Sequence, residues 1–292
     1  MLSPKPILVS RCATVATSNS DCGPEHGISR PIDRCAKSSV FVRYLGYAHD
    51  TVAAYGRRAN GKRNRLHGHD RVQPATGRRA MSGPHQGQQL VTAGTALPEA
   101  SAAAVLVHGR GATARSIVQM GAEFQQDGLA LLAPQAARNT WYPNSFLSPV
   151  EQNEPGRTSG LQAIEDAVTK AEEAGIPTDR VLVLGFSQGA CLASEFVARN
   201  PQRYGGLVAL SGGLIGETID ESEYEGDIEE TPVFLGCSDV DPHIPEERVH
   251  VTASVFEQLN GDVEERIYEG MGHGVNEDEL AYVSSLAATL VN

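Results

Sequence analysis

Short apolar runs alternate with longer segments of helical periodicity from residue 102 to the end of the chain. A continuous apolar run, such as 102–107, is typical of a strand buried on both faces of a parallel sheet. The segment 158–174 places apolar residues three to four positions apart, which indicates an amphipathic helix. This alternation predicts an α/β fold, a doubly wound and mostly parallel sheet with helices on both faces.

The expected elements have the following bounds. Strands are predicted at 102–107, 128–133, 181–184, 206–210, 231–236 and 263–268. Helices are predicted at 112–126, 158–174, 190–198, 245–259 and 276–291. The stretch 217–230 is almost wholly acidic and polar, which predicts a solvated excursion on the surface.

Residues 1–80 show no such periodicity. They hold 14 of the 24 Lys and Arg but only 5 of the 36 Asp and Glu. A basic cluster at 60–65 and a histidine pair at 67–69 are weak signs of nucleic acid or metal binding, since no aromatic residues or further ligands accompany them. We interpret 1–80 as a disordered or spurious extension and 81–292 as the folded domain. A chain starting at Met81 is expected to fold and stay active, which an assay of the truncated protein tests.

The remainder of the chain is strongly acidic. It carries 10 Lys and Arg against 31 Asp and Glu, and Lys170 is its one lysine. Such a surface is typical of proteins from a salt-rich cytoplasm, where salt screens the self-repulsion. The other reading is a moderately acidic protein of an ordinary cytoplasm. The net negative charge of residues 81–292 repels phosphate, so no nucleic acid partner is expected.

Hydrophobicity predicts a cytoplasmic protein with no stable membrane association. No apolar run approaches the roughly 18 residues of a membrane span, and the N-terminal run 6–9 is too short for a signal-peptide core. Five scattered cysteines are too few for a disulfide framework. Cys191 and Cys237 fall in predicted elements and read as small buried apolar residues.

A motif of the form G-x-S-x-G occupies 185–189, as Gly-Phe-Ser-Gln-Gly. It lies between a predicted strand and a predicted helix, which is the setting that a nucleophile elbow requires. The tight turn would hold Ser187 out at the carboxyl end of the strand, above the positive N-terminal end of the helix. The pattern therefore predicts Ser187 as a nucleophile, and the alternative is an ordinary exposed serine in a glycine turn.

A serine nucleophile needs a general base, and in hydrolases of this topology the base is a histidine late in the chain. His243, His250 and His273 follow Ser187. His273 lies between the last strand and the last helix, at the edge of the sheet where the elbow also lies. We predict His273 as the base, His250 as a helix-surface residue, and His243 as a residue that can shape the site.

The acid that orients the base is expected after the strand at 231–236. Asp239 and Asp241 both qualify there, and either can instead be a turn or helix-capping carboxylate. Pro242 restricts the preceding residue to an extended conformation. We therefore predict Asp241 as the acid.

A glycine loop follows the first predicted strand, as His108-Gly109-Arg110-Gly111. Two backbone N–H groups are predicted to bind a developing oxyanion, those of Arg110 and of Gln188, the residue after the nucleophile. The alternative for the glycines is a plain strand-to-helix turn. For His108 we expect a hydrogen bond that stabilises the loop.

Together the motifs at 108–111, 185–190, 241–245 and 270–273 resemble the phospholipase/carboxylesterase family. These are small α/β-hydrolases that include acyl-protein thioesterases and are related to dienelactone hydrolases. The resemblance spans about residues 100–292 and implies a triad of Ser187, Asp241 and His273, no metal or cofactor, and no large lid. Arg110 departs from the apolar residue common in the family, so its side chain can meet an anionic substrate or point to solvent.

We therefore expect a serine hydrolase that cleaves small-molecule carboxylic esters, or thioesters, through an acyl-enzyme on Ser187. Trp141, Tyr142 and Phe146 are predicted to line the acyl pocket or, alternatively, to pack in the core. The same triad could cleave lactones, dienelactones or peptides, and a non-catalytic ligand-binding relative is the alternative from another class. A monomer or a homodimer is expected.

Overall fold

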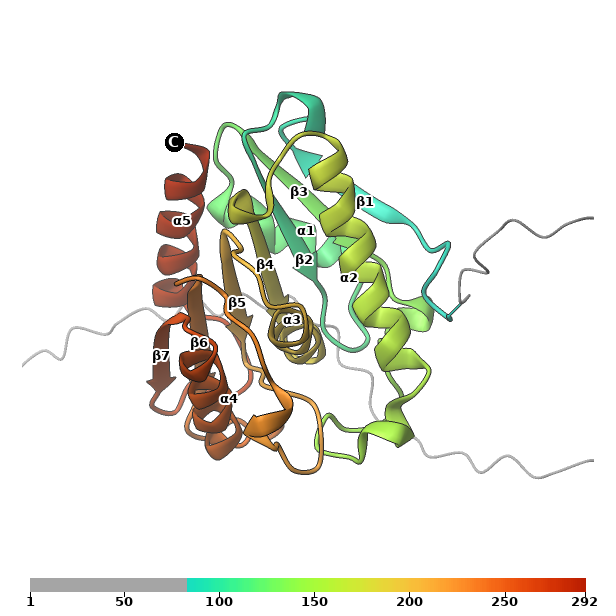
Figure 1. The fold of residues 1–292 in the computed structure, drawn as a ribbon, viewed down its shortest axis with the longest axis vertical. Coiled ribbons are helices and arrows are strands. Elements are labelled where there is room, and N and C mark those ends of the chain that lie inside the picture. The colour runs from blue at the N-terminus through green and yellow to red at the C-terminus, as the bar shows by residue number, and fades with distance from the viewer. Residues whose placement is uncertain (1–82) are drawn as a thin grey trace, which may run out of the picture. The chain divides into compact units, whose positions relative to one another are not determined.

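The computed structural model of the protein describes residues 83–292. One sheet with the strand order β1-β3-β2-β4-β5-β6-β7 forms its centre (Figure 1). All neighbouring strands are parallel except β1 and β3, which are antiparallel. The strands are β1 (Leu90–Gly94), β2 (Ala102–Val107), β3 (Leu129–Pro134), β4 (Val181–Phe186), β5 (Gly206–Leu210), β6 (Pro232–Ser238) and β7 (Asp262–Tyr268). The helices are α1 (Ala114–Gly121), α2 (Gly156–Glu173), α3 (Gln188–Arg199), α4 (Glu246–Gln258) and α5 (Glu277–Val291).

The predicted α/β architecture is confirmed, and six of the seven strands match their predicted positions to within two residues. β1 was missed because it is a short antiparallel edge strand, only partly buried, and lacks the apolar run of the inner strands. The helix predicted at 112–126 is shorter, since Thr113 caps α1 and the chain tightens into a 3-10 turn at Ala122–Phe124. The predictions for residues 1–80 lie outside the described residues.

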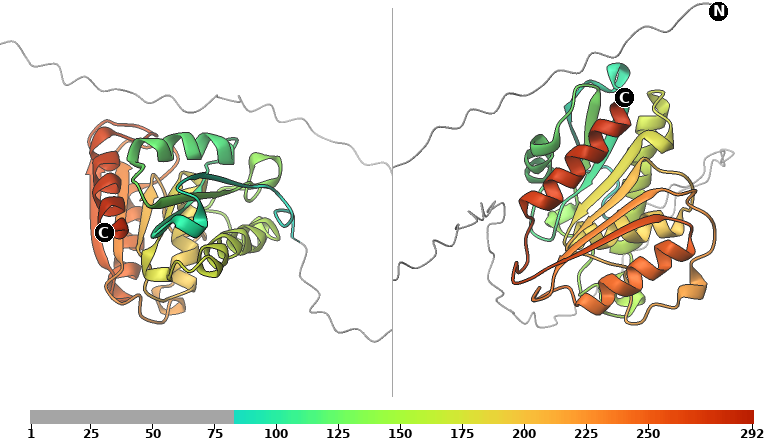
Figure 2. Two further views of the ribbon diagram at one scale, coloured as in Figure 1. Left: turned by 90° about the horizontal axis from the view of Figure 1, so that it is seen from above. Right: turned by 90° about the vertical axis from the view of Figure 1, so that its left-hand side faces the viewer.

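Two apolar layers sandwich the sheet. Helices α2, α3 and α4 pack on one face, where Ile164, Phe196 and Phe256 are buried. Helices α1 and α5 pack on the other, with Ile117 and Val283 in the core. Figure 2 shows α4 and α5 on opposite sides of the sheet. Within residues 83–292 each of these helices follows a strand, and none is inserted as a lid.

The acidic stretch 217–230 is a loop, as predicted, but it is not wholly solvated. Its carboxylates are mostly exposed, whereas the side chains of Tyr224 and Ile228 are only 3% and 0% exposed. Both belong to the apolar cluster on the α3 and α4 face. Two apolar side chains therefore fasten an otherwise polar loop to the core.

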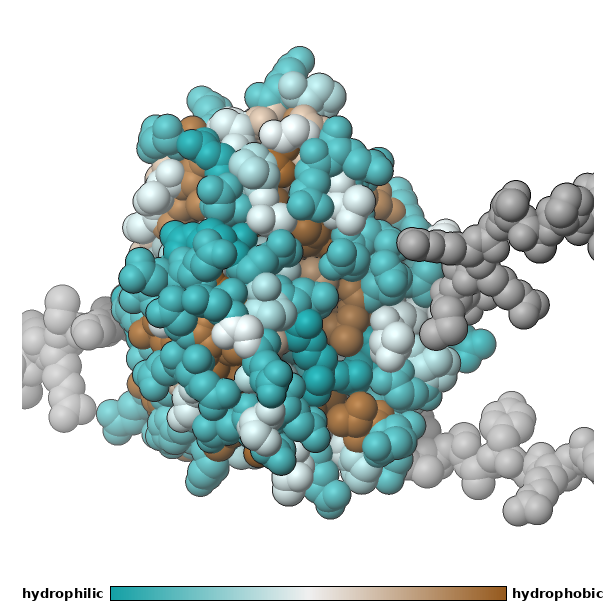
Figure 3. Space-filling model, in the orientation of Figure 1, coloured by the Kyte–Doolittle hydropathy of each residue, from teal (hydrophilic) through white to brown (hydrophobic). Residues whose placement is uncertain are grey.

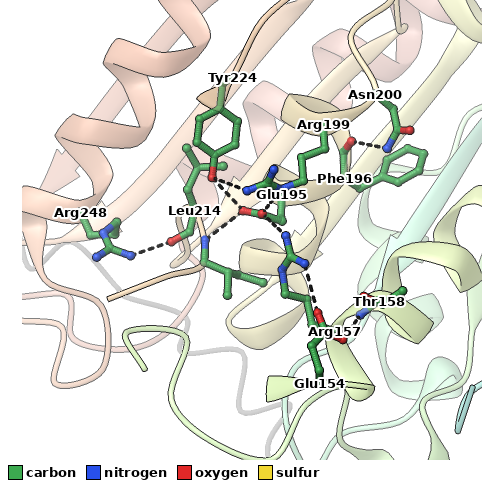
Figure 4. A network of polar contacts seen from close by, with 11 residues as sticks. Glu154, Arg157, Thr158, Glu195, Phe196, Arg199, Asn200, Leu214, Tyr224 and Arg248 are labelled. Carbon is green, nitrogen blue, oxygen red and sulfur yellow. Dashed lines mark hydrogen bonds and ion pairs between the residues drawn. The ribbon is translucent and has the colours of Figure 1, made fainter. Parts of the chain in front are cut away.

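A buried ion-pair network ties this loop to the helices (Figure 4). The Glu195 carboxylate of α3 is 0% exposed and accepts hydrogen bonds from the guanidinium groups of Arg157 and Arg199. It also accepts from the Ile215 N–H and the Tyr224 hydroxyl. If a buried carboxylate lost these donors, the folded state would be destabilised by several kcal/mol. Four donors instead join α2, α3 and the loops after β5 around one charge.

Candidate active site

Ser187 occupies a strained turn between β4 and α3. Its backbone has φ 56° and ψ −121°, a conformation that is rare for a residue with a side chain. The two flanking glycines are required by space, since a Cβ at Gly185 would overlap the Gly189 backbone, and one at Gly189 would overlap the Val107 carbonyl. Strand, turn and helix thus form the elbow that the motif predicts, and the Ser187 side chain projects above the sheet edge.

Three side chains distant in sequence form one hydrogen-bonded chain. His273 Nε2 lies 2.9 Å from Ser187 Oγ, and His273 Nδ1 lies 2.7 Å from Asp241 Oδ2. The Asp241 side chain is 0% exposed and the His273 side chain 14% exposed. Hydrogen bonds of this length are short enough for proton transfer from the hydroxyl to the imidazole. The predicted nucleophile, base and acid therefore meet at one point.

The His273 ring is packed between two other rings. Its centroid lies 5.1 Å from that of Phe186 in a tilted arrangement, and 4.9 Å from that of His243 in an edge-to-face arrangement. Phe186 immediately precedes the nucleophile, and His243 is two residues beyond the acid. These contacts restrict rotation of the imidazole, so its Nε2 edge stays toward Ser187.

The loop that carries His273 is anchored to the end of β6. Asp239 Oδ1 accepts the Gly270 N–H at 2.7 Å, and Ser238 Oγ accepts the Gly272 N–H at 2.9 Å. Asp239, the other candidate acid, thus binds the backbone of the histidine loop, and Asp241 faces the imidazole itself.

Asp241 is held in its ionised form. Burial alone would raise its pKa, but hydrogen bonds from His273 and from the backbone N–H groups of His243 and Ile244 outweigh burial, so the pKa lies below its ordinary value of 3.8. A charged carboxylate accepts a hydrogen bond from the Nδ1–H and leaves Nε2 free to accept the hydrogen bond from the serine hydroxyl.

The two predicted oxyanion donors belong to residues next to Ser187 in the chain and in space. Gln188 is the first residue of α3, so its N–H has no acceptor within the helix. Gly109 lies directly against Ser187, since a Cβ built on it would be 3.4 Å from the Ser187 Cβ. Arg110 follows it, and among the hydrogen bonds of residues 83–292 none uses its N–H.

The Arg110 side chain is exposed, as one of the two alternatives expected, and it also binds a neighbouring loop. Its guanidinium donates to the carbonyls of Pro143, at 3.0 Å, and of Asn144. It also lies 6.0 Å above the Tyr142 ring, within reach of a weak cation–π contact. The charge is therefore bound to a neighbouring loop.

His108 stabilises its loop, as predicted. It is buried, its Nδ1 bonds the Gly109 carbonyl and its Nε2 accepts the Ala136 N–H. Burial lowers its pKa to about 4, so the ring stays neutral near pH 7. The fixed protonation state keeps the glycine loop in one arrangement.

The three rings predicted to line a pocket lie mainly in the core. Trp141 and Tyr142 are 0% and 1% exposed, which fits the packing alternative, and Phe146 is 6% exposed. Cys191 and Cys237 are free, buried thiols, as expected, and burial raises the pKa of both to about 12. Neither sulfur is a nucleophile at neutral pH.

A buried carboxylic acid supports the histidine loop from behind. Glu279 in the first turn of α5 is 0% exposed, and one of its oxygens accepts the Asn276 N–H at 2.8 Å. In return, the Asn276 side-chain oxygen accepts the Glu279 N–H. The two hydrogen bonds form a capping box that begins three residues after His273. The other oxygen has no partner within residues 83–292 and abuts Gly236. Burial raises the Glu279 pKa to about 7.

We expect Glu279→Gln to stabilise the protein at pH 8. The folded-state pKa of about 7 exceeds the ordinary 4.5, so ionisation costs stability progressively between those values and fully above pH 7. Glutamine keeps the acceptor and never ionises, so the gain is up to about 3 kcal/mol at pH 8 and near zero at pH 4. Urea unfolding at both pH values measures it.

Glu277→Gln is the matched control, because it removes the same charge from an exposed position in the same turn. We expect its stability to follow the wild-type pH dependence. Equal pH dependence in wild type and Glu279→Gln would contradict a raised pKa at Glu279.

Two further searches concern the described part of the chain alone. Within residues 83–292 no group of three or more His, Cys, Asp or Glu side chains is arranged to hold a metal ion. In the same range no helix combines the length and apolar character of a membrane span.

Comparison with known proteins decides the family. The family model described as Phospholipase/Carboxylesterase matches residues 93–290, more than half of the chain. The chain belongs to this family. The crystal structure of a phospholipase/carboxylesterase from Dyadobacter fermentans is similar, with a TM-score of 0.67 and 38% identity over 72% of this chain and 99% of that chain.

The chain is also similar to part of a curated protein and to a second solved structure. Acyl-protein thioesterase 1 of Saccharomyces cerevisiae is 33% identical over 133 residues, which are 44% of this chain and 58% of that protein. The aligned region thus spans little more than half of the yeast enzyme. The crystal structure of SOBER1 from Arabidopsis thaliana has the same fold, with a TM-score of 0.53 at 21% identity over 65% of this chain and 99% of that one.

Proposed function

We propose that the protein is a serine hydrolase of small-molecule carboxylic esters, with thioesters as a second substrate class. The observation that carries the proposal is the hydrogen-bonded chain from Ser187 Oγ through His273 to Asp241. A hydroxyl in contact with an oriented imidazole, at the N-terminus of a helix, is the arrangement that acyl transfer needs. The family membership supports the same chemistry.

In the proposed mechanism Ser187 Oγ attacks the ester carbonyl as His273 Nε2 takes the hydroxyl proton. The charge that develops on the carbonyl oxygen is bound by the N–H groups of Arg110 and Gln188. The tetrahedral adduct collapses, His273 protonates the leaving alcohol or thiol, and an acyl-enzyme remains. His273 then deprotonates a water molecule, whose attack releases the acid and restores Ser187. Asp241 holds the imidazole in its tautomer throughout.

Labelling with a fluorophosphonate tests this proposal. The probe phosphonylates an activated serine, so we expect one adduct per chain, located by mass spectrometry on the peptide that contains Ser187. Short p-nitrophenyl esters are expected to compete with it and to be hydrolysed. A protein that neither reacts with the probe nor hydrolyses the esters would be a non-catalytic ligand-binding relative.

The alternative substrates differ in their acyl group and in their leaving group. The name of the yeast relative, acyl-protein thioesterase 1, favours thioesters. Lactones, dienelactones and peptides are substrates for the same mechanism, and a panel of esters graded by chain length, with one member of each other class, separates these activities. Of the three predicted pocket rings, Phe146 keeps the largest exposed fraction, 6%, and is the one we retain as a substrate contact.

We further propose that the acidic surface is an adaptation to salt in a cytoplasmic enzyme. Figure 3 shows polar residues over most of one face, with small and scattered apolar patches. Repulsion among excess negative charges destabilises the folded state unless salt screens it. The screening length falls to about 3 Å at 1 M salt. We expect a higher melting temperature in 2 M KCl than in 0.05 M KCl. Equal melting temperatures would indicate an ordinary acidic protein.

Whether residues 1–80 belong to the functional protein, and whether it is a monomer or a homodimer, remain predictions from sequence. The folded domain is proposed as 81–292. Mass measurement in solution distinguishes the two assembly states.

A further inference from the structure

The two residues that offer oxyanion donors both send their side chains to one loop, residues 141–144. Gln188 accepts the Trp141 N–H on Oε1 and donates from Nε2 to the Tyr142 carbonyl, each at 2.9 Å. Arg110 donates to the carbonyls of the next two residues, Pro143 and Asn144. Four consecutive residues of the loop are thus held by the side chains of the two residues that we propose as oxyanion donors.

The same loop is joined to the glycine loop by two further hydrogen bonds. Trp141 Nε1 donates to the His108 carbonyl at 2.8 Å, and the Gly111 N–H donates to the Asn139 carbonyl at 2.7 Å. Trp141 is 0% exposed and Gln188 is 6% exposed. Hydrogen bonds shielded from water exchange slowly and resist displacement. Residues 139–144 therefore connect the glycine loop to the start of α3, through buried residues at 141–142 and exposed residues at 143–144.

We propose that the side chains of Arg110 and Gln188 are positioning groups that fix the oxyanion hole by fastening it to residues 141–144. This inference rests on the hydrolase function proposed above. Both oxyanion donors are backbone N–H groups, so no side-chain substitution by another non-proline residue removes them. A substitution can only move them, and a displacement of a few tenths of an ångström weakens a charge-stabilising hydrogen bond.

The chemistry of the two side chains suits this role. The planar guanidinium of Arg110 presents parallel N–H groups to two successive carbonyls, which a single ammonium cannot do equally well. The Gln188 amide offers an acceptor and a donor at once and so satisfies both an N–H and a carbonyl. In each residue the proposed oxyanion donor is the backbone N–H, and the side-chain polar atoms bind the loop.

Replacement of each side chain by methionine tests the proposal, because methionine keeps the length and removes the polar atoms. Loss of an oxyanion donor lowers kcat by about 10²–10³. We expect a partial loss here, roughly tenfold for Arg110→Met and 10- to 100-fold for Gln188→Met, with KM for a short p-nitrophenyl ester within about twofold of wild type. The inhibition constant of phenylboronic acid, which forms a tetrahedral adduct on serine, is expected to rise in parallel with the loss.

Two conservative variants and one control sharpen the test. Arg110→Lys is expected to recover part of the rate, since it retains one donor, and Gln188→Glu keeps the acceptor for the Trp141 N–H but loses the donor to Tyr142. Arg115→Met removes an exposed arginine from the first turn of α1 and is expected to match wild type. Deuterium exchange of peptides covering 139–146 is expected to accelerate in Gln188→Met and to remain unchanged in Arg115→Met.

Unchanged kcat and phenylboronic acid affinity in both methionine variants would overturn the proposal. A loss confined to KM would also overturn it, because it would assign the side chains to substrate binding. Unchanged deuterium exchange in Gln188→Met would show that the loop is held by other contacts, and this measurement requires no catalytic activity. An inactive wild type that also fails to react with fluorophosphonate would instead refute the proposed function, and with it this inference.

Discussion

Replacing Ser187 with alanine is expected to lower kcat for a short p-nitrophenyl ester by about 10⁶-fold and to abolish fluorophosphonate labelling. The reason is that the serine oxygen forms the covalent bond of the acyl-enzyme, and no other side chain stands in its place beside His273 Nε2. The variant is still expected to hydrolyse the ester about 10³-fold faster than the uncatalysed reaction in water, through the oxyanion donors alone. Stopped assays over hours measure so low a rate.

Ser194→Ala is the matched control. Ser194 lies on the same helix, two turns beyond the elbow, and its buried hydroxyl has no hydrogen-bond partner within the described residues. Removing a buried unsatisfied hydroxyl does not destabilise the fold, so this variant is expected to keep full activity and labelling. Labelling that persisted in Ser187→Ala would assign the nucleophile to another residue.

Asp241→Asn is expected to lower kcat by roughly 10³–10⁴, the scale seen when the acid of a serine-protease triad becomes an amide. The carboxylate lies 2.7 Å from His273 Nδ1 and accepts a hydrogen bond from its N–H. An amide that presents its NH₂ group there would reverse the tautomer, put the proton on Nε2 and leave Ser187 without a base. Ester hydrolysis measured across pH 6–9 is expected to show the loss throughout, since asparagine does not titrate.

Asp239→Asn is the matched control, because Asp239 binds the loop that carries His273 and does not contact the imidazole itself. The change in charge is the same, and the asparagine oxygen can still accept the Gly270 N–H that Asp239 now accepts. We expect a loss of tenfold or less. If Asp239→Asn were instead the more damaging of the two variants, the acid would be Asp239, and the hydrogen bond between Asp241 and His273 would not be the one used in catalysis.

Local sequence was sufficient for most of the fold. The inner strands β2 and β5 have the predicted bounds, because continuous apolar runs are buried on both faces of a parallel sheet. β1 escaped prediction because an edge strand that pairs on one side needs no such run. Tyr224 and Ile228 escaped because two apolar residues in an acidic stretch have no period that marks them as buried.

The site divides in a similar way. The elbow around Ser187 was visible because strand, turn and helix are adjacent in sequence and the turn demands glycines. His273 and Asp241 were inferred from their order and from the strands they follow, since the carboxyl ends of parallel strands share one edge. The contacts made by the side chains of the two predicted oxyanion residues were not found. The side chains of Arg110 and Gln188 bind a loop more than 30 residues away, and neither motif indicates that loop.

Which residue types stand at strand ends can be read along the chain, because hydrophobic period and turn chemistry are properties of neighbouring residues. Which atoms then meet depends on the strand order β4-β5-β6-β7 and on the loop that follows β7. This loop brings two residues 86 positions apart, Ser187 and His273, to 2.9 Å. Hydrogen bonds between distant segments, such as those to residues 141–144, arise only after the sheet and its loops have packed. Tertiary structure alone therefore decided the geometry on which the chemistry depends.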